Sequence, residues 1–279
     1  MSERRVLLTS LYGGVGNRIK PLLSSRELAI ATDREHLVYW KRDHRFQAKL
    51  SQLWNFDVRL VSFVQNAYAL KKHPTVTTGQ AVTELNDVSW VNARHHDPFE
   101  FAEQPRTWEE SFRELVPHES IQVSIRTLLS NSLLSGPYVG LMVRAHNQAH
   151  PHTKSTSPVS WFVARINQIL EVSPDMSFYL SCDDPGTQAE LQSQFPSIVA
   201  MKKVGRYNST AGVQEAVADL YLLAQSSYLI GPAWSTFVHM ADALRPAPMY
   251  RVETPLDPPD VPVDFRSLAP SSSQYSWIR

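Results

Sequence analysis

Apolar runs and helical stripes alternate along the first forty residues of the chain. The apolar run Val6–Ser10 leads into a glycine-rich stretch, Gly13–Arg18. Apolar positions then recur at helical spacing, at Ile19, Leu22, Leu23, Ala29 and Ile30. A second apolar run, Leu37–Trp40, follows. Short apolar runs are typical of buried strands, and the helical spacing is typical of an amphipathic helix, so this segment predicts a strand–loop–helix–strand unit.

The same alternation returns in the second half, after Gly136 and Pro137. Between Trp40 and Ser135 the pattern is mixed, although Trp108–Val116 has helical character. Beyond it we predict strands at Tyr138–Val143, Ser177–Ser181, Ser197–Met201 and Tyr228–Ile230. Apolar residues at helical spacing lie between and after these strands, within Trp161–Leu170, Gln188–Phe195, Val213–Leu223 and Phe237–Leu244. Strands that alternate with helices indicate parallel sheets.

These patterns predict an α/β fold with two domains. The break near Ser135 gives an N-terminal α/β domain at 1–135 and a C-terminal α/β domain at 136–245. The segment 246–279 is rich in proline and serine, so we expect an extended tail that wraps the surface. Two doubly wound, Rossmann-like domains that face a cleft are the architecture that fits this order of elements.

The glycine-rich stretch is the first candidate binding site. Glycines allow backbone N–H groups to approach a ligand, and a helix N-terminus favours negative charge. A phosphate group is therefore the expected ligand. The stretch is neither the dinucleotide fingerprint, because its spacing differs and no acidic residue ends Leu37–Trp40, nor a Walker loop, because it lacks the Gly-Lys-Ser/Thr sequence. Tight packing alone would also explain glycines at this position.

Composition narrows the class of protein. The chain has 279 residues, and its 27 Lys and Arg residues balance its 27 Asp and Glu residues. Net charge therefore gives no argument for a nucleic-acid partner or an anionic membrane. The single cysteine, Cys182, excludes an intramolecular disulfide and fits a reducing compartment. Because no apolar run is long enough to span a bilayer, we expect a soluble, cytoplasmic protein without a membrane anchor.

Four blocks in one order resemble a known family. They are Gly13–Trp40, Tyr138–Arg144, Phe178–Asp184 and the stretch from Gly212–Leu220 to Ser235–Phe237. Together they resemble the superfamily of fucosyltransferases that includes the NodZ-like enzymes and the protein O-fucosyltransferases. The resemblance implies a GT-B-like fold. It also implies that the C-terminal domain holds most of the nucleotide of a GDP-sugar, with GDP-fucose as the expected donor.

The resemblance also implies roles for single residues. Arg144 matches the arginine that contacts the donor's pyrophosphate and stabilises the departing GDP, as a guanidinium can without a metal. Asp219 matches the carboxylate that accepts hydrogen bonds from guanine. The remaining donor-binding positions that the resemblance implies are Gly14, Gly16, Asn17 and Arg18 in the N-terminal loop, Asp183 and Asp184 near the nucleoside, and Ser235 and Thr236 near the phosphates.

Simpler structural roles compete with these assignments. Arg144 could be an ion-pair partner, and Asp219 could lie on a solvated helix face. Asp183 and Asp184 could form only a turn and a helix cap, and Ser235 could be only a cap.

The chain also departs from the family pattern. Met142 replaces the histidine of the family's His-x-Arg motif. His146, His150 and His152 follow Arg144, where other members carry arginine and aspartate or glycine. Neutral imidazole is a common metal ligand, although histidines in a loop without a metal are the competing interpretation. Because relatives on this scaffold include metal-dependent GDP-sugar mutases, His146 is a candidate catalytic residue beside Arg144.

The favoured function is transfer of fucose, or a related hexose, from GDP-fucose to a small-molecule or glycan acceptor, with no cofactor. A base from the N-terminal half would deprotonate the acceptor, and His95, His96 and Asp97 are its candidates. The first alternative is a pyranose–furanose mutase that needs a divalent cation, Mg²⁺ or Mn²⁺. The second is a non-catalytic protein that binds nucleotide sugars. No nucleic-acid partner is expected.

Overall fold

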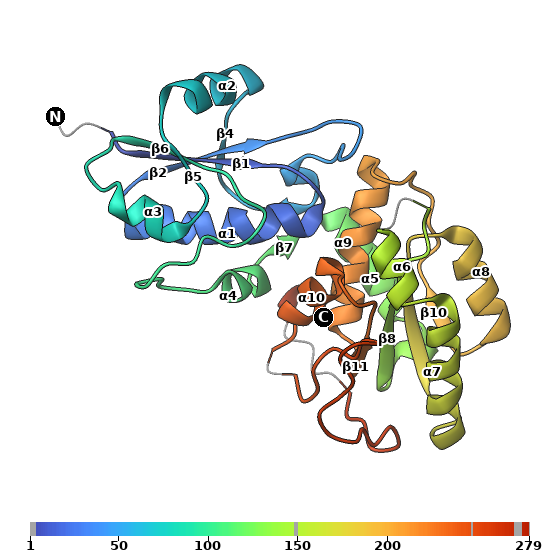
Figure 1. Ribbon diagram of the computed structural model, residues 1–279. Coiled ribbons are helices and arrows are strands. Elements are labelled where there is room, and N and C mark those ends of the chain that lie inside the picture. Colours follow the sequence, from blue (N-terminus) through green and yellow to red (C-terminus); the bar gives the residue numbers. More distant parts are fainter. Residues whose placement is uncertain (1–3, 148–149, 247, 271–274, 279) are drawn as a thin grey trace. The chain divides into compact units, whose positions relative to one another are not determined.

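A computed structural model describes residues 4–147, 150–246, 248–270 and 275–278. The chain forms two compact units. The first unit spans the chain up to Val116 and also takes in Asn208–Val213, and the second takes Pro117–Tyr207 and the chain from Gln214 onwards. Each unit is an α/β structure with a parallel sheet, as the alternation of apolar runs predicts (Figure 1).

The first unit is built around a five-stranded parallel sheet with the order β4-β2-β1-β6-β5. Its strands are β1 (Val6–Leu11), β2 (Glu35–Trp40), β3 (Trp54–Asn55), β4 (Arg59–Leu60), β5 (Thr75–Val76) and β6 (Trp90–Ala93), of which β3 lies outside this sheet. Its helices are α1 (Val15–Ala31), the short 3₁₀ helix η1 (Leu50–Gln52), α2 (Phe63–Lys72), α3 (Gly79–Glu84) and α4 (Trp108–Arg113).

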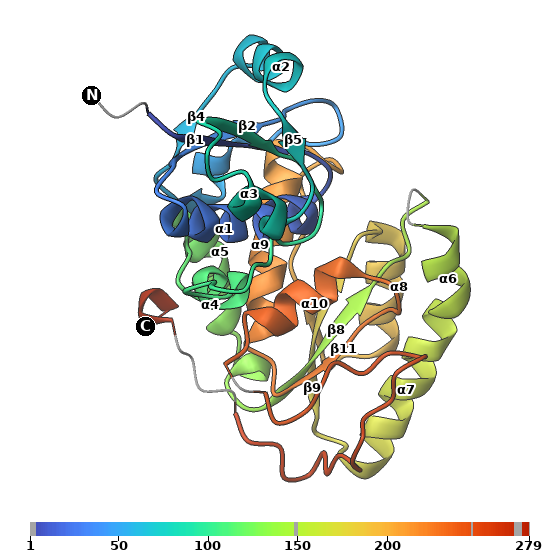
Figure 2. The same ribbon diagram turned by 60° about the vertical axis from the view of Figure 1, so that its left-hand side comes forward.

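Alternate residues of β1 face the two sides of this sheet. Leu7 packs with Leu28 of α1 and Val82 of α3, whereas Leu8 packs with Ala69 of α2. Side chains two residues apart on a strand share a face, which explains the division. Figures 1 and 2 show the same arrangement, with α2 on one side of the sheet and α1 and α3 on the other.

The second unit contains a four-stranded parallel sheet with the order β10-β9-β8-β11. Its strands are β8 (Tyr138–Val143), β9 (Ser177–Cys182), β10 (Ile198–Ala200) and β11 (Tyr228–Ile230). Its helices are α5 (Glu119–Leu129), η2 (Ser132–Leu134), α6 (Pro151–Thr156), α7 (Val159–Val172), α8 (Pro185–Gln194), α10 (Thr236–Ala243) and η3 (Ser276–Ile278). The division between the units passes through β7 (Val116–Pro117) and α9 (Thr210–Ala224).

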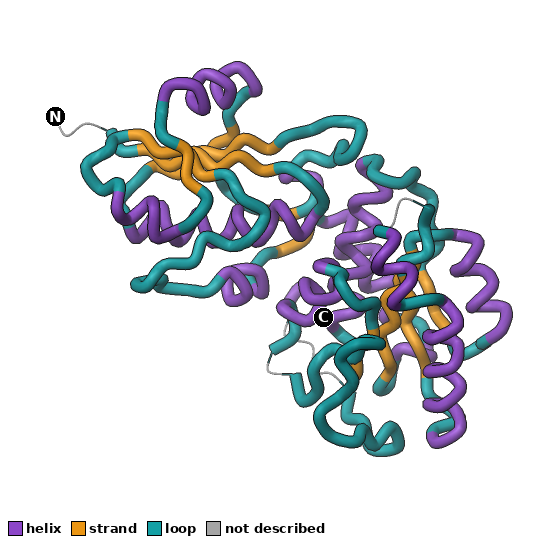
Figure 3. The backbone as a smooth tube through the Cα atoms, in the orientation of Figure 1, coloured by secondary structure: helices purple, strands orange, loops and turns teal. Residues whose placement is uncertain are grey.

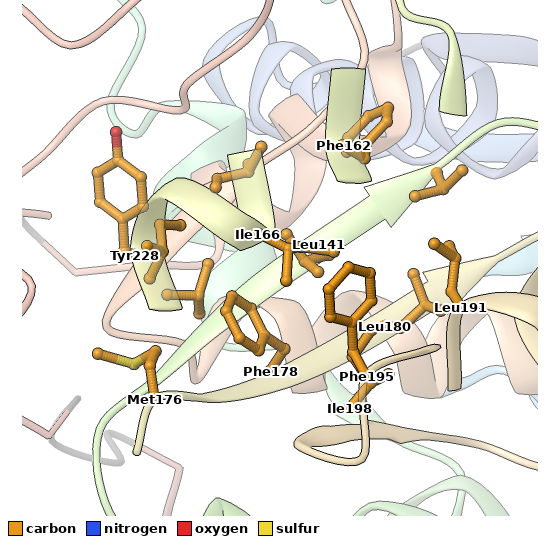
Figure 4. Close-up of a cluster of buried hydrophobic side chains, with 14 of the residues drawn as sticks. Leu141, Phe162, Ile166, Met176, Phe178, Leu180, Leu191, Phe195, Ile198 and Tyr228 are labelled. Atoms are coloured by element: carbon orange, nitrogen blue, oxygen red, sulfur yellow. The ribbon is translucent and has the colours of Figure 1, made fainter. Parts of the chain in front are cut away.

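Helices cover both faces of this second sheet. Helices α7 and α8 lie on one side of the strands, and α5 and α9 lie on the other (Figure 3). Leu141 and Phe178 belong to one core cluster with Phe162 and Ile166 of α7, which Figure 4 shows. On the opposite face, the Tyr138 hydroxyl donates to the backbone oxygen of Leu222 in α9 at 2.7 Å. The face that meets α9 therefore carries polar side chains as well as apolar ones.

Two features differ from the sequence-based predictions. The compact units divide between Val116 and Pro117, ahead of the predicted boundary at 135/136, because Ile121 and Ile125 give α5 an apolar side that is buried in the second unit. The tail after Pro246 does more than wrap the surface, since Phe265 belongs to the core, packs edge-on against Tyr228 of β11 and is 5 % exposed. Within the described residues, no helix is both long and apolar enough to cross a membrane.

Candidate functional site

The candidate site lies where the strands of the second sheet end. Strands β8, β9 and β11 are parallel neighbours, so their carboxyl ends meet at one edge of the sheet. Val143 and Cys182 are paired in register at the last position of β8 and β9. Arg144 and Asp183, the next residue of each strand, consequently leave the sheet side by side.

Arg144 and Asp183 form an ion pair at this edge. An Arg144 guanidinium nitrogen lies 3.1 Å from Asp183 Oδ2. Asp183 Oδ1 accepts hydrogen bonds from the backbone N–H of Ala145 at 2.7 Å and of His146 at 2.9 Å. One carboxylate therefore fixes both the chain after β8 and the guanidinium. The Arg144 side chain keeps 28 % of its surface exposed, so a ligand can reach it from the solvent side.

His146 continues from this pair into an aromatic contact. Its ring stacks on Tyr207, with the ring centroids 4.3 Å apart and the planes 7° from parallel. His150 lies at the N-cap of α6, where its Nδ1 accepts from the backbone N–H of His152 at 3.2 Å. His152 instead contacts the Trp234 ring. The three histidines thus have separate neighbours, and no group of three His, Cys, Asp or Glu side chains among the described residues is arranged to hold a metal ion.

The turn after β11 brings the predicted phosphate-binding hydroxyls to the same edge. Ser235 occupies the N-cap position of α10, and Thr236 is its first residue. The Ser235 hydroxyl lies 3.9 Å from the Met142 sulfur, whereas Thr236 is exposed. Ser235 therefore has the position of a cap but directs its side chain toward β8. The Ser235 side chain makes no cap hydrogen bond to α10, and a helix N-terminus favours an anion through its dipole.

Asp219 lies on α9 and is buried against the face of the sheet that this helix covers. It is 3 % exposed, which excludes the solvated-face interpretation. Its Oδ1 accepts from the Tyr179 hydroxyl at 2.6 Å, and its Oδ2 accepts from the Ser181 hydroxyl at 2.7 Å and pairs with the Lys203 ammonium. A carboxylate offers about four acceptor positions, so most of those on Asp219 are already occupied.

Asp184 and Cys182 have local structural roles beside the site. Asp184 caps α8, where its carboxylate accepts from the Thr187 backbone N–H at 2.8 Å, and this hydrogen bond lowers the pKa of Asp184. The cap interpretation therefore holds for Asp184, and contact with a nucleoside stays a prediction. Burial raises the pKa of the Cys182 thiol to about 12, so the thiol stays protonated at neutral pH.

The glycine-rich loop of the first unit joins β1 to α1. Gly13 has φ +84°, and a Cβ at this position would lie 3.1 Å from the Asn17 side chain, so the loop requires glycine there. Gly14 is the N-cap of α1, and a Cβ on it would meet nothing within 4 Å. Gly16 is buried in the first turn of the helix. The open space at Gly14 is compatible with the predicted approach of a ligand.

Arg18 lies inside the first unit. It is 1 % exposed and donates to the backbone oxygens of Gly13 and Lys41, each at 2.7 Å. Its guanidinium also stands 4.0 Å from the centroid of the Phe46 ring. Burial lowers its pKa to about 10, which still leaves it charged at neutral pH. In this arrangement Arg18 shapes the loop from within, and its contact with a donor sugar remains a prediction.

The candidate bases of the first unit lie beyond β6. Asp97 pairs with Lys20 at 3.1 Å, and its backbone N–H donates to His95 Nδ1. The His96 ring packs edge-on against Tyr12, with the centroids 4.2 Å apart. Burial, followed by the neighbouring His95, lowers the pKa of His96. The lowered pKa favours the neutral form of His96, which is the form that a general base needs.

Comparisons with solved structures place this architecture among known folds. The fucosyltransferase NodZ from Bradyrhizobium superposes with a TM-score of 0.60 at 15 % identity, over 88 % of this chain and 95 % of NodZ. POFUT1 in complex with GDP gives 0.54 at 12 % identity, over 91 % and 99 % of the two chains. The chain has the fold of these fucosyltransferases.

Further comparisons agree with this fold. NodZ co-crystallised with GDP gives a TM-score of 0.62 at 16 % identity, over 88 % of this chain and 94 % of NodZ. FUT1 from Arabidopsis thaliana, also crystallised with GDP, gives 0.58 at 17 % identity, over 87 % and 68 % of the two chains. No protein-family model and no curated protein sequence matches the chain. The predicted GT-B-like α/β fold is confirmed, and so is the resemblance at the level of the fold.

Several residues of the site had no assignment from the sequence. Tyr179 and Ser181 are two positions apart on β9, so the strand period alone would have placed them on one face. Lys203 and Trp234 lie in loops, where no period predicts a side-chain direction. Contacts over long separations, such as those of Lys203 with Asp219 and of His152 with Trp234, become visible only in the folded chain.

Proposed function

We propose that this chain is a GDP-sugar enzyme that transfers fucose from GDP-fucose to a small-molecule or glycan acceptor. The observation that carries the proposal is the Arg144–Asp183 pair at the carboxyl edge of a parallel sheet. Ligands of open α/β sheets bind at this edge. The start of α10 lies after the neighbouring strand β11, so a second group that favours anions belongs to the same edge. The fold is one that known structures of fucosyltransferases with bound GDP share.

Arg144 is the proposed catalytic residue. When the bond between the anomeric carbon and the diphosphate oxygen breaks, its electron pair leaves with GDP, and negative charge grows on the diphosphate. A guanidinium that is already held in place stabilises this charge without reorganisation. Asp183 holds Arg144 by one oxygen while its other oxygen accepts from two backbone N–H groups. The incoming acceptor hydroxyl loses its proton to a base as its oxygen bonds to the anomeric carbon.

If Asp219 recognises guanine, its carboxylate has to exchange one of its present hydrogen-bond partners for the base. The N1–H and amino group of guanine require two acceptor positions, whereas Asp219 already binds Tyr179, Ser181 and Lys203. Of these partners, Lys203 is the one on a flexible side chain in a loop, and it keeps 14 % of its side chain exposed. We propose that Lys203 leaves Asp219 when GDP binds, which frees the carboxylate for the base.

The test is incubation of the protein with GDP-fucose alone, followed by NMR, in EDTA, in Mg²⁺ and in Mn²⁺. A transferase without its acceptor is expected to release GDP and fucose slowly to water in all three conditions, and the Arg144→Ala variant is expected to lose this release. Furanose signals that disappear with EDTA would instead identify the mutase alternative. Binding of GDP without release of GDP from GDP-fucose would favour the non-catalytic alternative.

A calorimetric titration with GDP and ADP completes this test. Binding of GDP with weaker binding of ADP is the expected result, because adenine does not offer the donors of guanine. No heat with GDP, together with no turnover of GDP-fucose, would contradict the proposed function as a whole.

A further inference from the structure

Trp234 has a backbone conformation that bulky residues rarely adopt. Its φ is +63°, in the left-handed region that favours glycine. It lies in the turn between β11 and α10, directly before Ser235. A side chain persists in this region only where its surroundings fix the backbone, and such positions cluster at ligand sites. The conformation of Trp234 therefore needs an explanation.

The neighbours of Trp234 fix the turn from both sides. A Cβ on Gly231 would lie 2.4 Å from the Val238 side chain, so this part of the turn presses closely against α10. The backbone N–H of Ala233 donates to the buried hydroxyl of Ser157 at 2.9 Å. Ser235 on the other side is 7 % exposed. The chain has little freedom at Trp234, and the strain is held by packing.

This fixed turn presents an indole ring to solvent. Trp234 is 68 % exposed, which is unusual for the largest apolar side chain. Its ring lies 5.4 Å from the His152 ring of α6, centroid to centroid, at an angle of 52°. His152 therefore supports the indole from one side and leaves other parts of its surface open. A rigid, supported and exposed aromatic ring is the form of a binding platform.

The surroundings of the indole define what it would bind. Ser235, the next residue, directs its hydroxyl toward Met142, two residues before Arg144, so Trp234 belongs to the same edge of the sheet as the proposed diphosphate site. An indole face does not bind phosphate, but it packs well against the apolar C–H face of a sugar ring. The ligand that combines both features is a sugar attached to a diphosphate.

We infer that Trp234 is the platform for the sugar ring of the donor, with His152 bracing the indole. This inference rests on the proposed function, because it places the diphosphate at Arg144 and at the start of α10. The guanine base is assigned to Asp219, which is buried among Tyr179, Ser181 and Lys203. The ribose joins the base to the diphosphate, so the ring that remains on the other side of the diphosphate, for an exposed indole beside the phosphate turn, is the transferred sugar.

The test compares GDP and GDP-fucose by calorimetry, because the two ligands differ only in the transferred sugar, fucose. Trp234→Ala is expected to weaken binding of GDP-fucose by about threefold to tenfold, the range of one aromatic ring contact, and to leave binding of GDP unchanged. Trp234→Phe is expected to keep most of the affinity for GDP-fucose. Phe63→Ala is the matched control, since Phe63 is 69 % exposed on α2, and it is expected to change neither affinity.

Trp234→Gly keeps the test decisive if the alanine variant folds poorly, because glycine suits the positive φ and also removes the indole. An equal loss of affinity for GDP and GDP-fucose would assign the indole to the base, the ribose or the phosphates and overturn the inference. Unchanged affinity for GDP-fucose in both variants would overturn it as well, while the proposed function would stand. A wild-type protein that binds neither ligand would overturn the proposed function and the inference together.

Discussion

Each unit has an arginine after one of its central strands, Arg18 in the first turn of α1 and Arg144 directly after β8, and the two arginines differ. Arg18, after β1, is 1 % exposed and donates to backbone oxygens of its own loop and of Lys41. Arg144 follows β8. Among the ion pairs of the described residues its partner is Asp183, and 28 % of its side chain is exposed. One guanidinium is used within the fold, and the other remains accessible to a ligand.

Arginines at similar positions, after a buried strand, therefore have different roles in the two units. Both arginines follow buried strands, and both match the family pattern, so the sequence assigns both to the donor site. Burial and partners decide between them. Arg18 fixes the glycine-rich loop of the first unit, whereas Arg144, at the carboxyl edge of the second sheet, is accessible to an anion.

The largest expected effect is on catalysis by Arg144. Arg144→Ala is expected to lower kcat/KM for release of GDP from GDP-fucose by about 10²- to 10³-fold, because it removes a preorganised group that stabilises the transition state. Affinity for GDP should fall much less, and Arg144→Lys should recover part of the rate. Steady-state kinetics together with calorimetry measures both effects. Near-normal turnover of the alanine variant would remove Arg144 from the mechanism.

Arg18→Ala is expected to act on stability instead. It leaves backbone oxygens in a buried loop without their donor and opens a cavity beside Phe46, so the free energy of unfolding should fall by about 2–4 kcal/mol. The matched Arg144→Ala variant should change it by less than about 1 kcal/mol. Urea denaturation of both variants provides the measurement. If Arg18→Ala left stability unchanged and abolished binding of GDP, the contrast between the two arginines would be wrong.

The contrast marks the limit of what the sequence predicts. The strands of the second sheet and the first two strands of the first sheet, β1 and β2, follow from local apolar periods. Strands β4, β5 and β6 do not, because they lie in the stretch between Trp40 and Ser135 where the pattern is mixed. The gathering of Arg144, Asp183 and Ser235 at one edge also follows, because parallel strands end together. Burial does not follow, since it depends on residues far along the chain: Phe46 and Lys41 enclose Arg18, and no local pattern predicts them.

Asp183→Asn tests whether the charge of Asp183 orients the Arg144 guanidinium. The amide oxygen can still accept from the backbone of Ala145 and His146, but the charge facing Arg144 is lost. We expect about a tenfold fall in kcat with little change in KM, because the guanidinium loses its fixed orientation. Asp175→Asn, at an exposed position between α7 and β9, serves as the control and should leave kcat close to that of the wild type. An equal loss in the two variants would indicate a general effect of removing a carboxylate.

Asp219 and Lys203 test whether a buried, paired group in the second unit still binds a ligand. Lys203→Gln is expected to strengthen binding of GDP relative to ADP by about threefold to fivefold, because the base no longer competes with an ammonium for the carboxylate. Asp219→Asn should remove most of the discrimination between GDP and ADP. Calorimetry with both nucleotides measures the ratio. Unchanged discrimination in the Asp219 variant would assign its network to the core of the unit.

A separate expected effect concerns pH and the stability of the first unit. Burial lowers the pKa of His36 from 6.5 to about 3, and its Nε2 contacts the hydroxyls of Thr9 and Ser25. At pH values between these two pKa values, His36 binds a proton in the unfolded state but not in the folded state. The free energy of unfolding therefore falls as the pH falls. The loss from this group should reach at most about 2 kcal/mol by pH 5. His36→Gln should show a shallower dependence in urea denaturation at pH 5 and pH 7.5, and an identical dependence would contradict this origin.

A crystal structure of the protein with GDP tests the central claim most directly. We predict the diphosphate within hydrogen-bonding distance of the Arg144 guanidinium and of the first residues of α10, with Arg18 still bonded to the backbone oxygens of its own loop. A diphosphate bound by Arg18, with Arg144 distant from both phosphorus atoms, would contradict the account.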